Sequence, residues 1–105
     1  MKRINNFKQI HVGDFVFFQH KKDSSSDDIA ECYKIARSKI NPYKLKYSFK
    51  IIARNEAGEI WYTWNLIEGN INMNIWDCFL VKKQDLILYS YLRNKSPRFF
   101  TLLQQ

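Results

Sequence analysis

The chain has 105 residues, a length that suits one domain with a core of its own. Hydrophobic residues make up 46% of it and aromatic residues 16%, which is typical of a folded globular protein and excludes a disordered one. The formal net charge is +7 at pH 7. A positive charge of this size favours polyanionic partners, although it also serves solubility alone.

The basic N-terminus lacks the apolar segment of a signal peptide, and no uncharged stretch is long enough to span a bilayer. The two cysteines, Cys32 and Cys78, are too few for a disulfide framework. Apolar residues flank each of them, which predicts buried free thiols. We therefore expect a cytoplasmic, intracellular protein without a membrane span.

The positive charge is concentrated in one part of the chain. Residues 32–55 contain seven basic side chains and no acid, whereas half of the ten acids lie within 14–31. Such asymmetry predicts a partner that is nucleic acid, an acidic protein surface or anionic lipid.

In chain order, residues 1–10 are expected to form a loosely attached N-terminal arm. The sequence His11-Val12-Gly13-Asp14 predicts a turn into a strand at 15–19, which is rich in β-forming residues. Residues 21–28 are polar and predict an exposed loop.

Residues 29–40 allow two interpretations. As a helix, the segment has a capping-box-like start at Asp28 and Glu31 and a stop at Asn41-Pro42. As a strand, it shows only a weak alternation of apolar and polar residues. Local signals favour the helix, but both interpretations stay open because a strand here would make the chain more uniformly β.

The clearest element is a β-hairpin with strands over 46–54 and 59–66 and a four-residue loop at 55–58. If Arg54 pairs with Glu59, the apolar residues of both strands share one face, and Ile52 stands opposite Trp61 on the other. The apolar pairs in this register are Ala53/Ile60, Ile51/Tyr62, Phe49/Trp64 and Tyr47/Leu66.

The rest of the chain is expected to form a connection at 67–74 and a strand at 75–81. Residues 85–92 suit either a strand or a helix. Ser96-Pro97 supplies an N-cap and a first-turn proline, which predict a C-terminal helix over 96–104.

The turn into a strand at 12–16, the polar loop, the central hairpin and a further short strand together resemble the small SH3-like barrels of KOW, Tudor and related modules. This resemblance covers residues 11–92 and implies a β-rich core that binds nucleic acid, peptide or protein without catalysis. The fold class expected is mainly β, a small SH3-like antiparallel barrel with one or two short helices in a single domain, 1–105. The alternative is an α+β fold with a three- or four-stranded antiparallel sheet packed on a helix.

Most catalytic chemistries lack their usual residues in this chain. His11, His20 and the two cysteines match no zinc-site spacing, and there is no glycine-rich phosphate loop or nucleophile elbow. A lone histidine near a carboxylate, as at His11 and Asp14 or at His20 and Asp23, is more typical of a surface pair. We expect no enzyme activity, no metal and no cofactor.

The hairpin face opposite the apolar pairs carries cations around Trp61. One hypothesis is a nucleic-acid platform, where cations neutralise phosphates and Trp61 stacks on a base of DNA or RNA. Another is a small regulator or inhibitor that docks Trp61 on an acidic surface of a larger protein machine. A third is that Ile52 and Trp61 are simply covered by residues 29–40 or the C-terminal tail. The predicted contact residues are Arg37, Lys39, Lys44, Lys46, Lys50, Arg54 and Trp61.

Overall fold

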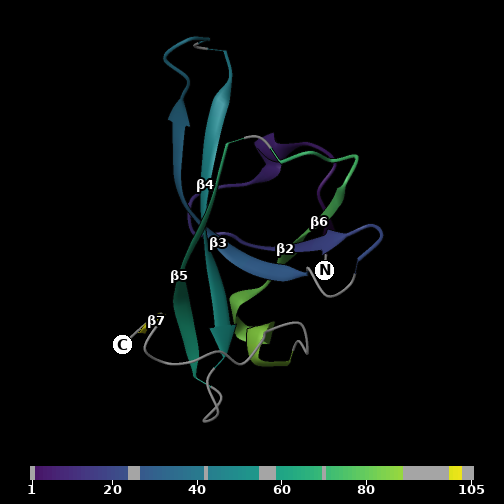
Figure 1. Cartoon of the computed structure of the whole chain (residues 1–105), viewed down its shortest axis with the longest axis vertical. Coiled ribbons are helices and arrows are strands. Elements are labelled where there is room, and N and C mark those ends of the chain that lie inside the picture. The colour runs from purple at the N-terminus through teal and green to yellow at the C-terminus, as the bar shows by residue number, and fades with distance from the viewer. Residues whose placement is uncertain are drawn as a thin grey trace.

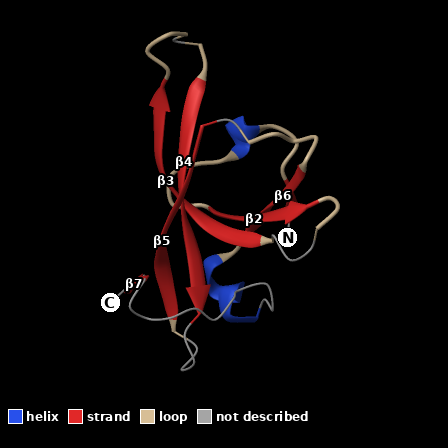
Figure 2. Cartoon of the chain, viewed as in Figure 1, coloured by secondary structure: helices blue, strands red, loops and turns tan. Residues whose placement is uncertain are grey.

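The computed structural model describes residues 2–23, 27–41, 43–54, 59–69, 71–88 and 100–102. Its strands are β1 (Lys2–Arg3), β2 (Phe15–His20), β3 (Asp28–Arg37), β4 (Leu45–Arg54), β5 (Ile60–Gly69), β6 (Trp76–Val81) and β7 (Phe100–Leu102). Two 3-10 helices, η1 (Phe7–Gln9) and η3 (Lys83–Leu88), lie beside them (Figures 1 and 2). The strands form one antiparallel sheet in the order β1-β6-β2-β3-β4-β5-β7.

The mainly β class predicted from the sequence is confirmed, and so are the strands expected at 15–19 and 75–81. The finer architecture differs. β1 and β7 lie at opposite edges of the sheet, so the described strands form an open sheet and not the expected SH3-like barrel. The α+β alternative fails as well, because the segment that would supply its helix is a strand.

The segment left open at 29–40 forms β3, which is paired with β2 on one side and β4 on the other. A β-bulge at Tyr33 shifts the register between Cys32 and Lys34. The extra residue switches the parity of the inward-facing positions, from Ala30 and Cys32 before the bulge to Ile35 after it. This switch explains why a period-2 pattern is weak in the sequence, and pairing on both sides overrides the local capping signals.

The hairpin of β4 and β5 is observed, but its predicted register is wrong. Arg54 pairs with Ile60 rather than Glu59, and Ile52 pairs with Tyr62 rather than Trp61. A second irregularity, between Lys50 and Ile52, shifts the remaining pairs further along β5. Apolar alternation specifies a register only where one face is buried, and this sheet is buried on both.

Two apolar clusters cover the two faces of the sheet. The inner strand β2 shows the division most clearly, since Val16 and Phe18 belong to one cluster and Phe15 and Phe17 to the other. The first cluster comprises Ile4, Ile10, Val16, Phe18, Ala30, Cys32, Tyr47, Phe49, Ile51 and Cys78. The second comprises Phe15, Phe17, Ile29, Ile52, Val81 and Leu86.

The N-terminal segment is part of the core, contrary to the loosely attached arm expected for residues 1–10. Ile4 and Ile10 are buried in the first cluster, and Lys2 and Arg3 pair with β6. A capping box between Asn6 and Gln9 shapes the short helix η1 between them. The segment therefore closes the first face of the sheet.

The second face is closed by η3, whose Leu86 is fully buried. The segment left open at 85–92 is thus 3-10 helical as far as Leu88. The C-terminal helix expected over 96–104 is wrong for residues 100–102, which form β7 against Trp61–Thr63 of β5. The other residues of that prediction lie outside the described part of the chain.

The distal ends of β3 and β4 extend beyond the rest of the sheet, at the top of Figure 1. β2 pairs with β3 only as far as Glu31, and β5 pairs with β4 only as far as Tyr47. The last two pairs of β3 and β4, Ala36 with Lys46 and Arg37 with Leu45, therefore lie in a hairpin ribbon of only two strands. This projection gives the molecule its long axis of 43 Å, against 29 and 22 Å for the other two.

Burial of the N-terminal segment leads to a stability prediction. Ile4→Ala removes a side chain that is 1% exposed, so we expect the free energy of unfolding to fall by about 2–4 kcal/mol. Val12→Ala, at a side chain that is 60% exposed, is the control and should change it by less than about 0.5 kcal/mol. Urea unfolding followed by circular dichroism measures both, and equal small effects would mean that the segment is a loose arm.

Candidate functional site

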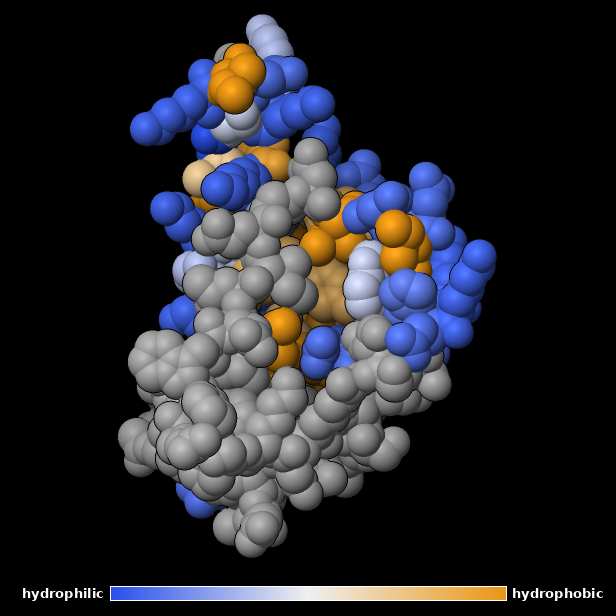
Figure 3. All heavy atoms as spheres, in the orientation of Figure 1, coloured by the Kyte–Doolittle hydropathy of each residue, from blue (hydrophilic) through white to orange (hydrophobic). Residues whose placement is uncertain are grey.

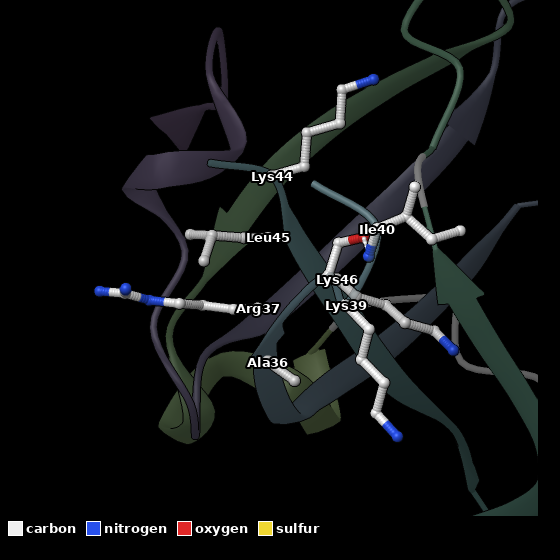
Figure 4. Close-up of a pocket in the computed structure, with 8 residues that line it drawn as sticks. Ala36, Arg37, Lys39, Ile40, Lys44, Leu45 and Lys46 are labelled. Atoms are coloured by element: carbon white, nitrogen blue, oxygen red, sulfur yellow. Dashed lines mark hydrogen bonds between the residues drawn. The ribbon is translucent and has the colours of Figure 1, made fainter. Parts of the chain in front are cut away.

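Four of the seven predicted contact residues gather at the end of the projecting hairpin. Arg37 ends β3, Lys39 and Lys44 belong to the loop, and Lys46 lies in β4. Together with Ala36, Ser38, Ile40 and Leu45 they line an open hollow of about 480 Å³ (Figure 4). We call this feature, residues 36–46, the hairpin tip.

Hydrogen bonds give the turn at the hairpin tip a defined shape. The Ser38 amide donates to the Lys44 carbonyl at 2.9 Å, which continues the ladder of β3 and β4. The Ser38 hydroxyl accepts from the amides of Ile40 and Asn41, both at 3.3 Å. The Asn41 side chain accepts from the Tyr43 amide at 3.1 Å. Side-chain acceptors of this kind hold loops in turn conformations.

This turn holds two large apolar side chains out in solvent. Ile40 is 97% exposed and Tyr43 is 92% exposed. The space-filling view shows an apolar patch at the end of the projection, surrounded by hydrophilic side chains (Figure 3). Neither residue is among the contact residues predicted from the sequence. The sequence does contain a signal for them, because two large apolar residues flank Asn41-Pro42 in a segment rich in lysine.

The hairpin tip is cationic on both of its sides. Arg37 and Leu45 extend to one side of the ribbon, and Lys39 and Lys46 to the other (Figure 4). From Lys34 to Lys46 the chain carries five cations and no acid. Among the described residues, Arg37, Lys39 and Lys44 make no ion pair. The charges of these three side chains are therefore not neutralised within the described part of the chain.

Lys50 lies about four residues further down β4 and is engaged within the protein. Its ammonium nitrogen is 4.8 Å from the centre of the Tyr33 ring and 5.1 Å from that of Tyr62, both cation–π distances. In the register of β3 and β4, Lys50 stands opposite Glu31, whose carboxylate accepts a hydrogen bond from the Tyr62 hydroxyl. Lys50 is thus separate from the hairpin tip and holds together an aromatic and ionic cluster.

Arg54 and Trp61 lie at the far end of β4, where it pairs with the start of β5. Leu45 and Arg54 are the first and last of the ten residues of β4, so they lie about 30 Å apart along the strand. The side chains of Arg54 and Trp61 lie outside the described part of the structure. Ile52, predicted to accompany Trp61 on an outer face, is 2% exposed and packs in the second cluster. The structure therefore does not bring the seven predicted residues into one site.

The two histidines occupy structural positions. The His11 ring is 3.7 Å from the Asp14 carboxylate and its side chain is 81% exposed. The Nδ1 atom of His20 accepts from the amides of Lys22 and Asp23, at 3.1 and 2.9 Å, and so shapes the start of the β2–β3 loop. In the described parts of the chain no three His, Cys, Asp or Glu side chains converge as a metal site. Among those same residues, no helix is long and apolar enough to cross a membrane.

Comparisons with known proteins add no functional information. No family model, curated protein or solved structure matches this chain. Function is therefore inferred from the residues of the hairpin tip and their geometry.

The cluster around Lys50 makes stability depend on pH. Burial raises the pKa of Glu31 above its usual 4.5, against the opposing effect of Lys50 and Lys83. The folded state then holds this proton more tightly than the unfolded state. The contribution of Glu31 to the free energy of unfolding is complete below pH 4.5 and is lost as the pH rises through the raised pKa.

We therefore expect the free energy of unfolding of Glu31→Gln, measured relative to that of the native protein, to increase as the pH rises from 4 to 7. Urea unfolding of both proteins at these two pH values measures the difference. A native protein that gains stability over the variant as pH rises would contradict the assignment.

The cysteines should be unreactive in the folded protein. Cys32 and Cys78 are both buried and free, as predicted. Burial raises the pKa of both thiols, that of Cys78 to about 12, and the thiolate is the reactive form. We expect an aromatic disulfide reagent at pH 8 to label both thiols only at the rate of unfolding. Immediate labelling of either thiol without denaturant would show that it is accessible.

Proposed function

We propose that the protein is a non-catalytic nucleic-acid-binding module and that the hairpin tip is its contact surface. The observation that carries the proposal is a projecting ribbon with cations on both sides, no acid and two exposed apolar side chains at its end. Cations that neutralise phosphates release condensed counterions, which provides most of the sequence-independent affinity for nucleic acid.

The surface differs from the one predicted from the sequence. The earlier hypothesis used the outer face of β4 and β5 with Trp61 at its centre. In the structure Ile52 of that face is buried, and Lys50 is held between two tyrosine rings. Of the predicted residues, those that support the proposal are Arg37, Lys39, Lys44 and Lys46, all of which line the hollow of the hairpin tip.

A small regulator that docks on an acidic protein surface is the second candidate. The exposure of Ile40 and Tyr43 favours it, because desolvated apolar anchors with a cationic rim are typical of protein interfaces. Such binding would depend more on the two apolar residues than on salt concentration, and this difference separates the candidates.

Fluorescence anisotropy with labelled DNA and RNA at several salt concentrations tests the proposal. Lys39→Ala/Lys44→Ala should weaken binding to all sequences and reduce the slope of log K against log salt by about 2. Lys22→Ala/Lys82→Ala removes the same charge from exposed positions elsewhere and is the matched control.

The expected result is a loss for the tip variant that clearly exceeds the loss for the control. Equal losses would mean that net charge acts without a defined site. An absence of binding to any nucleic acid at low salt would contradict the proposal and favour a protein partner.

A further inference from the structure

The dimensions of the hairpin tip limit what it can enter. Beyond Ala36 and Lys46 the ribbon has only two strands, and neither β2 nor β5 broadens it. Paired strands lie about 4.8 Å apart, and a strand with its side chains is about 10 Å thick. A projection of this size is narrow enough to lie in a groove rather than against a face.

The cations continue along β3 below the ribbon as well as at its end. Lys34 is exposed and lies three residues before Arg37, so the charged length is at least about 10 Å. A flat anionic surface, such as a lipid bilayer, would contact only the end of a ribbon that stands on it. Cations along both sides suit a partner that places phosphates on both sides, as the two strands of a duplex do.

The end of the ribbon is apolar and held in shape. The Ser38 hydroxyl and the Asn41 side chain order the turn that carries Ile40 and Tyr43. An aromatic surface alone would suit stacking on single-stranded bases, but Ile40 offers no ring for stacking. Apolar side chains, including isoleucine, act as wedges that enter between base pairs from the minor groove and kink the duplex.

We propose that the hairpin tip enters the minor groove of duplex DNA and that Ile40 and Tyr43 partly unstack one base step there. The inference rests on the nucleic-acid binding proposed above. The minor groove of B-DNA is about 6 Å wide, which is too narrow for the ribbon. Unstacking opens the groove, so the apolar end makes room for the cationic sides to reach phosphates on both strands.

A DNA duplex in which the base step is already loosened should therefore bind more tightly. The probes are a 20-base-pair matched duplex and the same duplex with a central two-base mismatch, both measured by anisotropy. We expect the native protein to prefer the mismatched duplex about tenfold, which corresponds to about 1.4 kcal/mol. Fluorophores at the two ends of the matched duplex should also approach each other on binding.

Two variants separate the wedge from the charge. Ile40→Ser/Tyr43→Ser should lose the preference and the bending, and it should bind matched duplex more weakly because the groove stays too narrow for the cationic sides. Lys39→Ala/Lys44→Ala should weaken binding to both duplexes and keep the preference. Both apolar side chains are more than nine-tenths exposed, so their replacement leaves the core intact, which thermal unfolding checks.

Each outcome bears on a different step of the argument. Equal affinity for the two duplexes with no bending would overturn the wedge and leave nucleic-acid binding in place. Binding to anionic phospholipid vesicles but to neither DNA duplex would overturn the wedge, and the absence of binding to labelled RNA as well would overturn both proposals. Retention of the mismatch preference by Ile40→Ser/Tyr43→Ser would assign the unstacking to other residues and overturn the role of this pair.

Discussion

β3 and β4 are longer than the stretches of neighbouring strand that pair with them, and this mismatch determines where the sheet ends and where the cations lie. β3 and β4 have ten residues each, but β2, which has six, pairs with only the first four residues of β3. β3 and β4 must therefore leave the sheet together, and their distal ends have only each other as partners. Near the centre of the sheet, where other strands flank this pair on both sides, β3 and β4 are buried. In the upper part they carry cations and an exposed turn.

Burial on both faces explains where polar side chains are located. η1 and the N-terminal segment close one face, and η3 closes the other. Lys50 and Glu31 remain near the second face because two tyrosine rings and a pair of opposite charges compensate for their partial burial. The remaining lysines of the acid-free stretch lie where β3 and β4 leave the sheet, so the length mismatch also concentrates the charge.

Strands with β-forming residues and a clear boundary could be predicted from the sequence, as at 15–19 and 75–81. The register of β4 and β5 could not, because alternation fails as a guide when both faces are apolar. β3 could not be distinguished from a helix, since the bulge at Tyr33 interrupts its period. The cationic half of the site could be predicted from the sequence, because cations close together in the sequence stay together in a hairpin. The exposure of Ile40 and Tyr43 depends on how far β3 and β4 extend beyond their neighbours, which local sequence does not state.

We propose the hairpin tip as the surface that contacts nucleic acid. Titration of the ¹⁵N-labelled protein with a short DNA duplex, followed by amide chemical shifts, tests it most directly, because every region of the chain reports at once. The account predicts that the largest changes fall within residues 36–46, with little change at 52–54 and 60–62. Changes concentrated around Arg54 and Trp61, where β4 ends and β5 begins, would contradict it.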